Sequence, residues 1–120
     1  LVITASGERS AESSGRLLYA AEPPVSGDWV GLRSQMVIDE ILPRRTRLSR
    51  RQPGKRDEEQ VLAANIDLVL VVTGLDHDFN LRRLERYKIV VAESGADLAL
   101  ILNKADLHPD VGAAVASVRG

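Results

Sequence analysis

Two apolar runs rich in β-branched residues, separated by a segment of helix length, constrain the fold of this chain most. The first run extends from Ile66 to Val72, and the second covers Leu98 to Leu102. A nearly continuous apolar run is typical of a strand that is covered on both faces. Between the runs, Asp78 or Asn80 can cap a helix and Gly95 can end it. The pattern therefore predicts a βαβ unit with a right-handed crossover, as in α/β sheets.

The helix expected between these strands carries apolar residues at helical spacing, with one exception. Lys88 falls between Leu84 and Val91 on the apolar face. A lysine is tolerated there when its aliphatic stem packs against apolar neighbours and its ammonium group reaches a polar environment. After the second strand, Pro109 to Val118 fits a further helix with proline in its first turn.

The first 42 residues follow a different pattern, of short runs with β-type alternation. Turn residues such as Ser26-Gly27-Asp28 separate these runs, and strands at this spacing favour a small sandwich or barrel. We expect Trp29 to pack within this β region rather than to stack on a nucleobase. Asp57 to Asn65 has an acidic start and predicts a short helix or helical turn. The runs expected to form strands are Leu1 to Thr4, Arg16 to Ala20, Trp29 to Arg33 and Met36 to Leu42.

The charge is distributed unevenly along the chain. The net charge is -1, but seven of the 16 basic residues lie in one acid-free stretch, and the other nine stand against 17 acidic residues, a net of -8. Such a basic strip predicts contact with a polyanion, and the alternative is a solvated linker. The basic strip consists of Arg44, Arg45, Arg47, Arg50, Arg51, Lys55 and Arg56.

Several kinds of site are disfavoured by composition and spacing. Without cysteine, the segment forms neither a disulfide nor a thiolate zinc site. No apolar run approaches the roughly 20 residues that span a bilayer, so we expect no membrane contact and a cytoplasmic location. The consecutive residues Asp76-His77-Asp78 are expected to form a loop and helix cap, because three neighbours rarely converge on one ion. His108 is expected to be exposed, and neither a catalytic pair nor a metal site is predicted in this segment.

The segment Asn103-Lys104-Ala105-Asp106 directly follows the second strand, where ligands bind in open α/β sheets. An ionised Asp106 only accepts hydrogen bonds, so it pairs with the ring N–H and exocyclic amine of guanine but not with adenine. Asn103 carries a donor and an acceptor for the other edge of the base, and the stem of Lys104 can lie along its face. These residues predict a guanine-binding loop, and the alternative is an ordinary turn into a helix.

A GTPase also needs a phosphate loop, and none precedes this segment. Ser49 to Arg56 contains Gly54-Lys55, but it lacks the first glycine and the Ser or Thr after the lysine, and Pro53 has no amide to donate. Asp28-Trp29-Val30-Gly31 has the letters of a magnesium switch, yet no buried strand precedes it. The guanine-binding loop is therefore either false or the first motif of a permuted order.

Taken together, the chain resembles the ribosome small-subunit-dependent GTPase A family of circularly permuted GTPases over nearly its whole length. The resemblance implies an OB-fold β-barrel with a basic linker over residues 1–56. It implies that residues 57–120 are the first βαβ part of a circularly permuted P-loop GTPase domain, incomplete here, with the phosphate loop later in the chain. The stretches that carry the resemblance are Val25 to Val30, Leu42 to Arg45, Glu59 to Asp67, Asp78 to Tyr87 and Asn103 to Asp106.

The resemblance also implies a function: a GTP-binding and hydrolysing factor of late small (30S) ribosomal subunit maturation, stimulated by that subunit. Implied partners are the 30S subunit with its 16S rRNA and assembly factors, and the protein is expected to be monomeric. GTP or GDP, Mg²⁺ and a structural Zn²⁺ are implied, with the metal ligands outside this segment. Only Asn103, Lys104, Ala105 and Asp106 map as nucleotide-binding residues, and none is catalytic.

We expect the basic strip to recognise the backbone and shape of RNA rather than to stack on its bases, because few aromatic residues are present. Two alternatives to a ribosome-associated GTPase stay open. One is an OB-fold RNA-binding module without nucleotide hydrolysis, and the other is a small α/β interaction domain.

Overall fold

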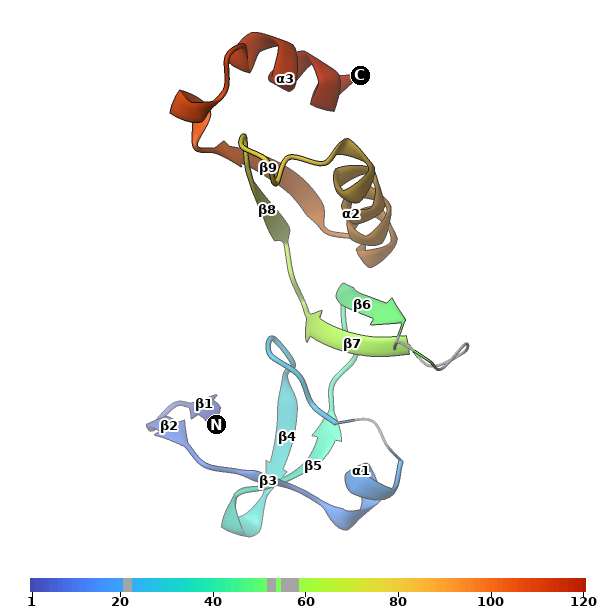
Figure 1. The fold of residues 1–120 in the computed structure, drawn as a ribbon. Coiled ribbons are helices and arrows are strands. Elements are labelled where there is room, and N and C mark those ends of the chain that lie inside the picture. Colours follow the sequence, from blue (N-terminus) through green and yellow to red (C-terminus); the bar gives the residue numbers. More distant parts are fainter. Residues whose placement is uncertain (21–22, 52–53, 55–58) are drawn as a thin grey trace.

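The predicted βαβ unit forms the C-terminal part of the chain in a computed structural model, which describes residues 1–20, 23–51, 54 and 59–120. It consists of β8 (Leu68–Gly74), α2 (Leu81–Ser94) and β9 (Asp97–Asn103) (Figure 1). The strands are parallel and pair in register along their whole length. Asn80 caps α2 by accepting a hydrogen bond from the Arg83 amide at 3.1 Å, and Gly95 ends the helix with φ of 85°. Both predicted helix boundaries are confirmed.

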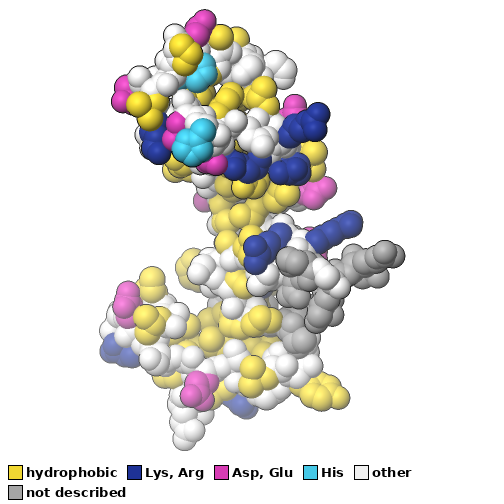
Figure 2. All heavy atoms as spheres, in the orientation of Figure 1, with side chains coloured by type: hydrophobic (Ala, Val, Ile, Leu, Met, Phe, Trp, Pro, Cys, Tyr) yellow, Lys and Arg dark blue, Asp and Glu magenta, His cyan; other side chains and the backbone are white. Residues whose placement is uncertain are grey.

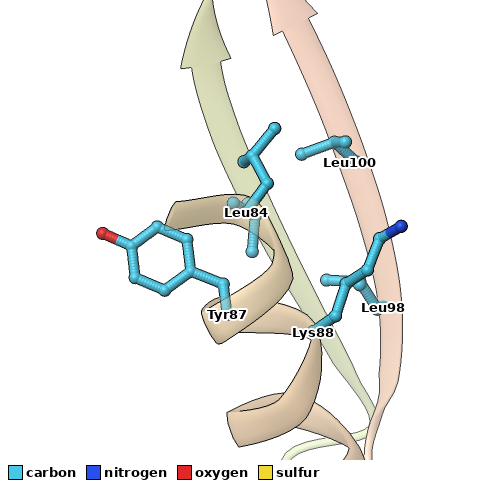
Figure 3. Close-up of a pocket in the computed structure, with 6 residues that line it drawn as sticks. Leu84, Tyr87, Lys88, Leu98 and Leu100 are labelled. Atoms are coloured by element: carbon cyan, nitrogen blue, oxygen red, sulfur yellow. The ribbon is translucent and has the colours of Figure 1, made fainter. Parts of the chain in front are cut away.

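One face of this two-stranded sheet packs against α2. Strand residues Leu98 and Leu100 line a small apolar pocket together with Leu84 and Lys88 of the helix (Figure 3). The Lys88 stem lies along this pocket, and its ammonium group donates to the Val118 carbonyl oxygen at 2.7 Å. The Lys88 side chain is accommodated in this way, because its apolar stem ends on a carbonyl at the negative end of a helix.

The helix that receives Lys88 is α3 (Val111–Arg119), which follows the short 3-10 helix η2 (Ala105–Leu107). Asp110 caps α3 by accepting from the Ala113 amide at 3.0 Å. The helix therefore begins after Pro109, which precedes the cap, and the prediction that proline occupies the first turn is wrong.

The opposite face of the sheet is exposed. Leu68, Leu70 and Val72 of β8 are 50%, 56% and 60% exposed, and Ile101 of β9 is 43% exposed. The expectation that these strands are covered on both faces is therefore wrong for the described residues. Their apolar composition is nevertheless that of strands in a sheet with two covered faces.

The N-terminal part is built from short strands in small open sheets. β1 pairs with β2 as an antiparallel hairpin, and β5 lies between β3 and β4. The strands expected near Leu1 to Thr4, Trp29 to Arg33 and Met36 to Leu42 are confirmed. The described strands do not close into a barrel. These elements are β1 (Val2–Thr4), β2 (Gly7–Arg9), β3 (Glu12–Ser13), α1 (Gly15–Tyr19), β4 (Val30–Arg33), η1 (Ser34–Met36) and β5 (Val37–Ile41).

The strand expected over Arg16 to Ala20 is wrong, because this segment forms helix α1. Ser14 is buried and accepts a hydrogen bond from the Leu17 amide at 3.3 Å, which caps the helix. A serine cap satisfies one amide that lacks a partner in the first turn. This local cap decides the conformation of a segment whose apolar pattern is too short to do so.

The helix expected over Asp57 to Asn65 is also wrong. Asp57 and Glu58 lie outside the described residues, and the segment that follows them is strand β7 (Glu59–Ala64). β7 pairs antiparallel with β6 (Arg47–Arg51), and Glu59 accepts hydrogen bonds from Arg47 and Ser49 of that strand. Pairing with a distant strand therefore overrides the helical preference of an acidic start.

The chain is elongated, with the β6–β7 pair between the N-terminal sheets and the βαβ unit (Figure 1). Its radius of gyration is 18.8 Å and its extents are 59 × 37 × 22 Å. A compact domain of this length has a radius of gyration of about 14 Å. No helix among the described residues has the length and apolarity needed to cross a membrane.

Candidate functional site

The predicted guanine-binding loop lies at the carboxyl end of β9, on the side of the βαβ unit away from the β region (Figure 1). Asn103 is the last residue of the strand, and Ala105 and Asp106 begin η2. Lys104 between them has a left-handed backbone with φ of 56° and ψ of 41°. All four residues are exposed. The turn therefore presents their side chains at the sheet edge where ligands bind in this class of fold.

The left-handed backbone of Lys104 costs roughly 1–2 kcal/mol for a residue with a side chain. Two contacts hold the turn in place. The Lys104 carbonyl oxygen accepts from the Leu107 amide at 3.0 Å, and the Asn103 carbonyl oxygen accepts from the Leu75 amide at 2.8 Å. Leu75 is 1% exposed, so the loop is fixed to a buried residue of the neighbouring strand end.

The loop that follows β8 reaches the guanine-binding loop through Asp76. Its Oδ2 accepts from the Lys104 ammonium at 3.1 Å, and its Oδ1 accepts from the Asp78 amide at 2.9 Å. The pKa of Asp76 is lowered by the hydrogen bond from the Asp78 backbone first, and then by Lys104. The Asp76 carboxylate is therefore held in its charged form.

Sequence reasoning assigned Asp76-His77-Asp78 to a loop and a helix cap, and missed the contact with Lys104. The structure shows the loop, although Asn80 rather than Asp78 caps α2. A signal for the missed contact was present, because residues that follow two adjacent parallel strands meet at the same edge. Gly74 pairs with Asn103 at that edge, two residues before Asp76.

His108 lies beyond the guanine-binding loop and touches the same neighbouring loop. Its ring meets Phe79 edge-on, with 6.4 Å between ring centroids. Its Nδ1 accepts a hydrogen bond from the Asp110 amide at 3.0 Å. His108 is only partly exposed, and its contacts orient the start of α3. The loop after β8 therefore contacts both Lys104 and His108, which precede and follow Ala105 in the chain.

Asp28, in the segment with the letters of a magnesium switch, is occupied by protein contacts. Its carboxylate accepts from Arg44 Nε and a terminal Arg44 nitrogen, both at 2.8 Å, and from the Val25 amide at 2.9 Å. The pKa of Asp28 is lowered, chiefly by the Arg44 hydrogen bonds. With 1% of its side chain exposed, Asp28 is a structural residue.

Part of the basic strip lies in a strand, since Arg47, Arg50 and Arg51 belong to β6. On the face shown in Figure 2, Lys and Arg side chains lie over α2 and β6. Arg45 contacts Asp67 and Arg47 contacts Glu59, both at 3.0 Å, yet both arginine side chains stay more than half exposed. Arg50 donates to Gln60 at 3.3 Å, Arg51 ends β6, and Lys55 and Arg56 lie outside the described residues. The structure therefore leaves an exposed basic surface at Arg45, Arg47, Arg50 and Arg51.

Trp29 does not pack within the described part of the β region. Its side chain is 73% exposed, so the expectation of a packed tryptophan is wrong. Its backbone is tied to the sheet through a hydrogen bond of 2.8 Å from the Leu42 amide to the Trp29 carbonyl oxygen.

A parallel βαβ unit with an exposed polar loop at the carboxyl end of its second strand is the arrangement of nucleotide-binding α/β proteins. The family model described as RsgA GTPase matches residues 41–118. This match covers more than half of the chain and includes both strands, α2 and the guanine-binding loop. The chain therefore belongs to the RsgA GTPase family.

Curated relatives agree with this assignment. The small ribosomal subunit biogenesis GTPase RsgA of Opitutus terrae is 46% identical over 136 residues, which cover 99% of this chain and 37% of that protein. The protein of the same name from Leptospira interrogans serovar Lai is 44% identical over 114 residues, covering 91% of this chain and 32% of the relative. The protein of the same name from Xylella fastidiosa strain M12 is 47% identical over 98 residues, which cover 82% of this chain and 29% of that protein. The chain spans about a third of the length of these relatives.

Proposed function

We propose that this chain is part of a GTP-binding and hydrolysing factor that acts in late maturation of the small (30S) ribosomal subunit. The observation that carries the proposal is the exposed loop Asn103-Lys104-Ala105-Asp106 at the carboxyl end of β9. The names of the relatives, small ribosomal subunit biogenesis GTPase, support the same function.

In this proposal, Asp106 accepts the ring N–H and the exocyclic amine of guanine, and Asn103 meets the opposite edge of the base. The stem of Lys104 lies along the base, and Ala105 completes the turn between Lys104 and Asp106. The loop selects the base and performs no chemistry on the phosphates. Hydrolysis requires residues outside this segment, and the proposed order of motifs is circularly permuted, with the phosphate loop following the guanine-binding loop.

The described residues do not fit the metals that this function implies. No group of three His, Cys, Asp or Glu side chains among them is placed to hold an ion. Asp28 is already bonded to Arg44, and the chain has no cysteine for a structural zinc. In this proposal the ligands of Mg²⁺ and Zn²⁺ lie outside this segment.

We divide the chain into an OB-fold β-barrel with the basic strip, residues 1–56, and the start of the permuted GTPase domain, residues 57–120. The β6–β7 pairing favours extending the first part to Ala64. In this proposal Arg45, Arg47, Arg50 and Arg51 contact 16S rRNA of the 30S subunit through phosphates. Arg44 contributes less, because its guanidinium is bonded to Asp28.

In this proposal the protein is cytoplasmic and monomeric, and it meets other assembly factors on the 30S subunit.

The test of the proposed function is a binding titration of the full-length protein with GDP and with ADP. We expect GDP to bind and ADP to bind far more weakly, since an acceptor on adenine faces the Asp106 carboxylate. Equal affinity for both nucleotides would contradict a guanine-binding loop. Binding to isolated 30S subunits is expected to weaken steeply with salt.

A further inference from the structure

We propose that Asp76 is a positioning residue for guanine binding, which holds the ammonium group of Lys104 and so fixes the Lys104 stem where the base stacks. This inference rests on the proposed function, because it adds a residue to the same nucleotide-binding loop. Asp76 lies 28 positions before Lys104 in the chain and belongs to the loop between β8 and α2.

Both carboxylate oxygens of Asp76 are occupied, which fixes the direction of the side chain. Oδ2 accepts from Lys104 Nζ at 3.1 Å, and Oδ1 accepts from the Asp78 amide at 2.9 Å. The Asp76 side chain is 13% exposed, whereas that of Lys104 is 54% exposed. The partly buried carboxylate is therefore a fixed anchor, and the lysine is the group that it orients.

The sheet end leaves room for this anchor because residue 74 is glycine. A Cβ atom at Gly74 would lie 3.0 Å from Asp76 Oδ1, tighter than nine in ten contacts of that kind. Gly74 pairs in register with Asn103, the first residue of the guanine-binding loop. The Asp76 carboxylate therefore folds back over the very strand end that adjoins the loop.

The anchor lowers the entropic cost of ordering the Lys104 side chain. Its side chain has many rotamers of similar energy, so an unanchored stem would have to lose that freedom when the base binds. The strained turn fixes its backbone, and the Asp76 contact fixes the far end of the side chain. Together the two contacts preorganise the apolar stem for the face of a planar base.

The test compares GDP affinity by calorimetry for full-length wild-type protein and two variants. Asp76→Asn keeps an oxygen for the Asp78 amide but removes the charge that holds Lys104, and we expect GDP to bind roughly three- to fivefold more weakly. The matched control is Asp78→Asn, whose carboxylate contacts Arg83 at 3.2 Å and not the guanine-binding loop. We expect its GDP affinity to equal that of the wild type.

A double-mutant cycle with Lys104→Met distinguishes positioning from a general structural effect. If Asp76 acts through Lys104, Asp76→Asn will cause no further loss of GDP affinity in the Lys104→Met protein. The preference for GDP over xanthosine diphosphate stays unchanged in Asp76→Asn, because Asp106 is untouched.

Unchanged GDP affinity in Asp76→Asn, or the same loss with and without Lys104, would overturn the inference. These outcomes leave the proposed function standing, provided that the wild type binds GDP. A wild-type protein that binds no GDP would overturn the proposed function and the role of Asp76 together.

Discussion

Asp28 and Asp106 both stand in short sequences with the letters of a GTPase signature, but their surroundings differ. The Asp28 side chain is 1% exposed and accepts hydrogen bonds from Arg44 and Val25, whereas Asp106 is exposed at the edge of the βαβ unit. A buried carboxylate that already accepts hydrogen bonds from Arg44 and Val25 is poorly placed to bind a ligand. A GTPase signature therefore predicts ligand binding only where a strand directly precedes it and its aspartate side chain is exposed.

The two regions also differ in how they connect the chain. Around Asp28, the Gly27 carbonyl oxygen accepts from the Asn65 side chain and the Ser26 carbonyl oxygen from the Ala64 amide, both at 2.9 Å. These bonds tie the N-terminal part to the end of β7. We therefore expect changes near Asp28 to reduce stability and changes near Asp106 to alter nucleotide selection.

The largest loss of stability is expected from Gly27→Ala. Gly27 has φ of +94°, and a Cβ atom there would lie 1.9 Å from the Ala64 carbonyl oxygen. Backbone strain and the clash together predict a loss of about 3 kcal/mol or more in the free energy of unfolding. Urea denaturation measures it. The control is Gly15→Ala, where a Cβ meets no atom within 4 Å. Equal losses of unfolding free energy in Gly27→Ala and Gly15→Ala would contradict this account of Gly27.

A smaller loss is expected from Asp28→Asn, which removes the charge facing Arg44. Breaking a fully buried pair costs about 3–5 kcal/mol, and we expect about 2 kcal/mol here because the Arg44 side chain is 20% exposed. Asp67→Asn is the control, since its pair with Arg45 is exposed and contributes at most about 1 kcal/mol. Thermal denaturation should rank the two variants in this order. A reversed order would show that the Asp28 pair is not the stronger contact.

The stabilisation from Asp28 should depend on pH. Its pKa is lowered in the folded protein, chiefly by Arg44, so the charged carboxylate stabilises the fold above its unfolded pKa of about 3.9. That contribution is lost as the pH falls through the lower folded pKa. We expect the stability difference between wild type and Asp28→Asn to narrow as the pH is lowered from about 5. A difference that stays constant down to the acid limit would contradict the charged pair.

The smallest effect is expected from a single change in the basic surface. Arg50→Ala should weaken binding to the 30S subunit modestly and reduce the slope of log affinity against log salt by about 1. GDP affinity should be unaffected, because Arg50 lies on β6, outside the βαβ unit. Filter binding over a series of salt concentrations measures the slope. An unchanged slope would remove Arg50 from the proposed RNA contact.

The sequence was sufficient to predict the βαβ unit, because its signals are local and agree with one another. The apolar runs, the Asn80 cap and the Gly95 end all lie within or beside the elements that they define. The position of the guanine-binding loop follows from the end of β9.

Two of the failures, the helix expected over Asp57 to Asn65 and the missed contact of Asp76, have a different cause, which is contact between distant parts of the chain. β7 is a strand because it pairs with β6, and Asp76 contacts Lys104 because two parallel strands end side by side. Neither pairing is visible in the residues of one segment alone. The exposed face of β8 fails in the opposite way. Its apolar pattern predicts that other residues pack on this face, and none of the described residues buries it.

The most direct test of the account is nucleotide selection by Asp106→Asn in the full-length protein. Exchange of the carboxylate for an amide replaces one acceptor with a donor, which matches the extra carbonyl of xanthine instead of the amine of guanine. We expect this variant to lose affinity for GDP and to gain affinity for xanthosine diphosphate. A variant that binds GDP as tightly as the wild type, with no gain for xanthosine diphosphate, would contradict the assignment of Asn103 to Asp106 as the guanine-binding loop.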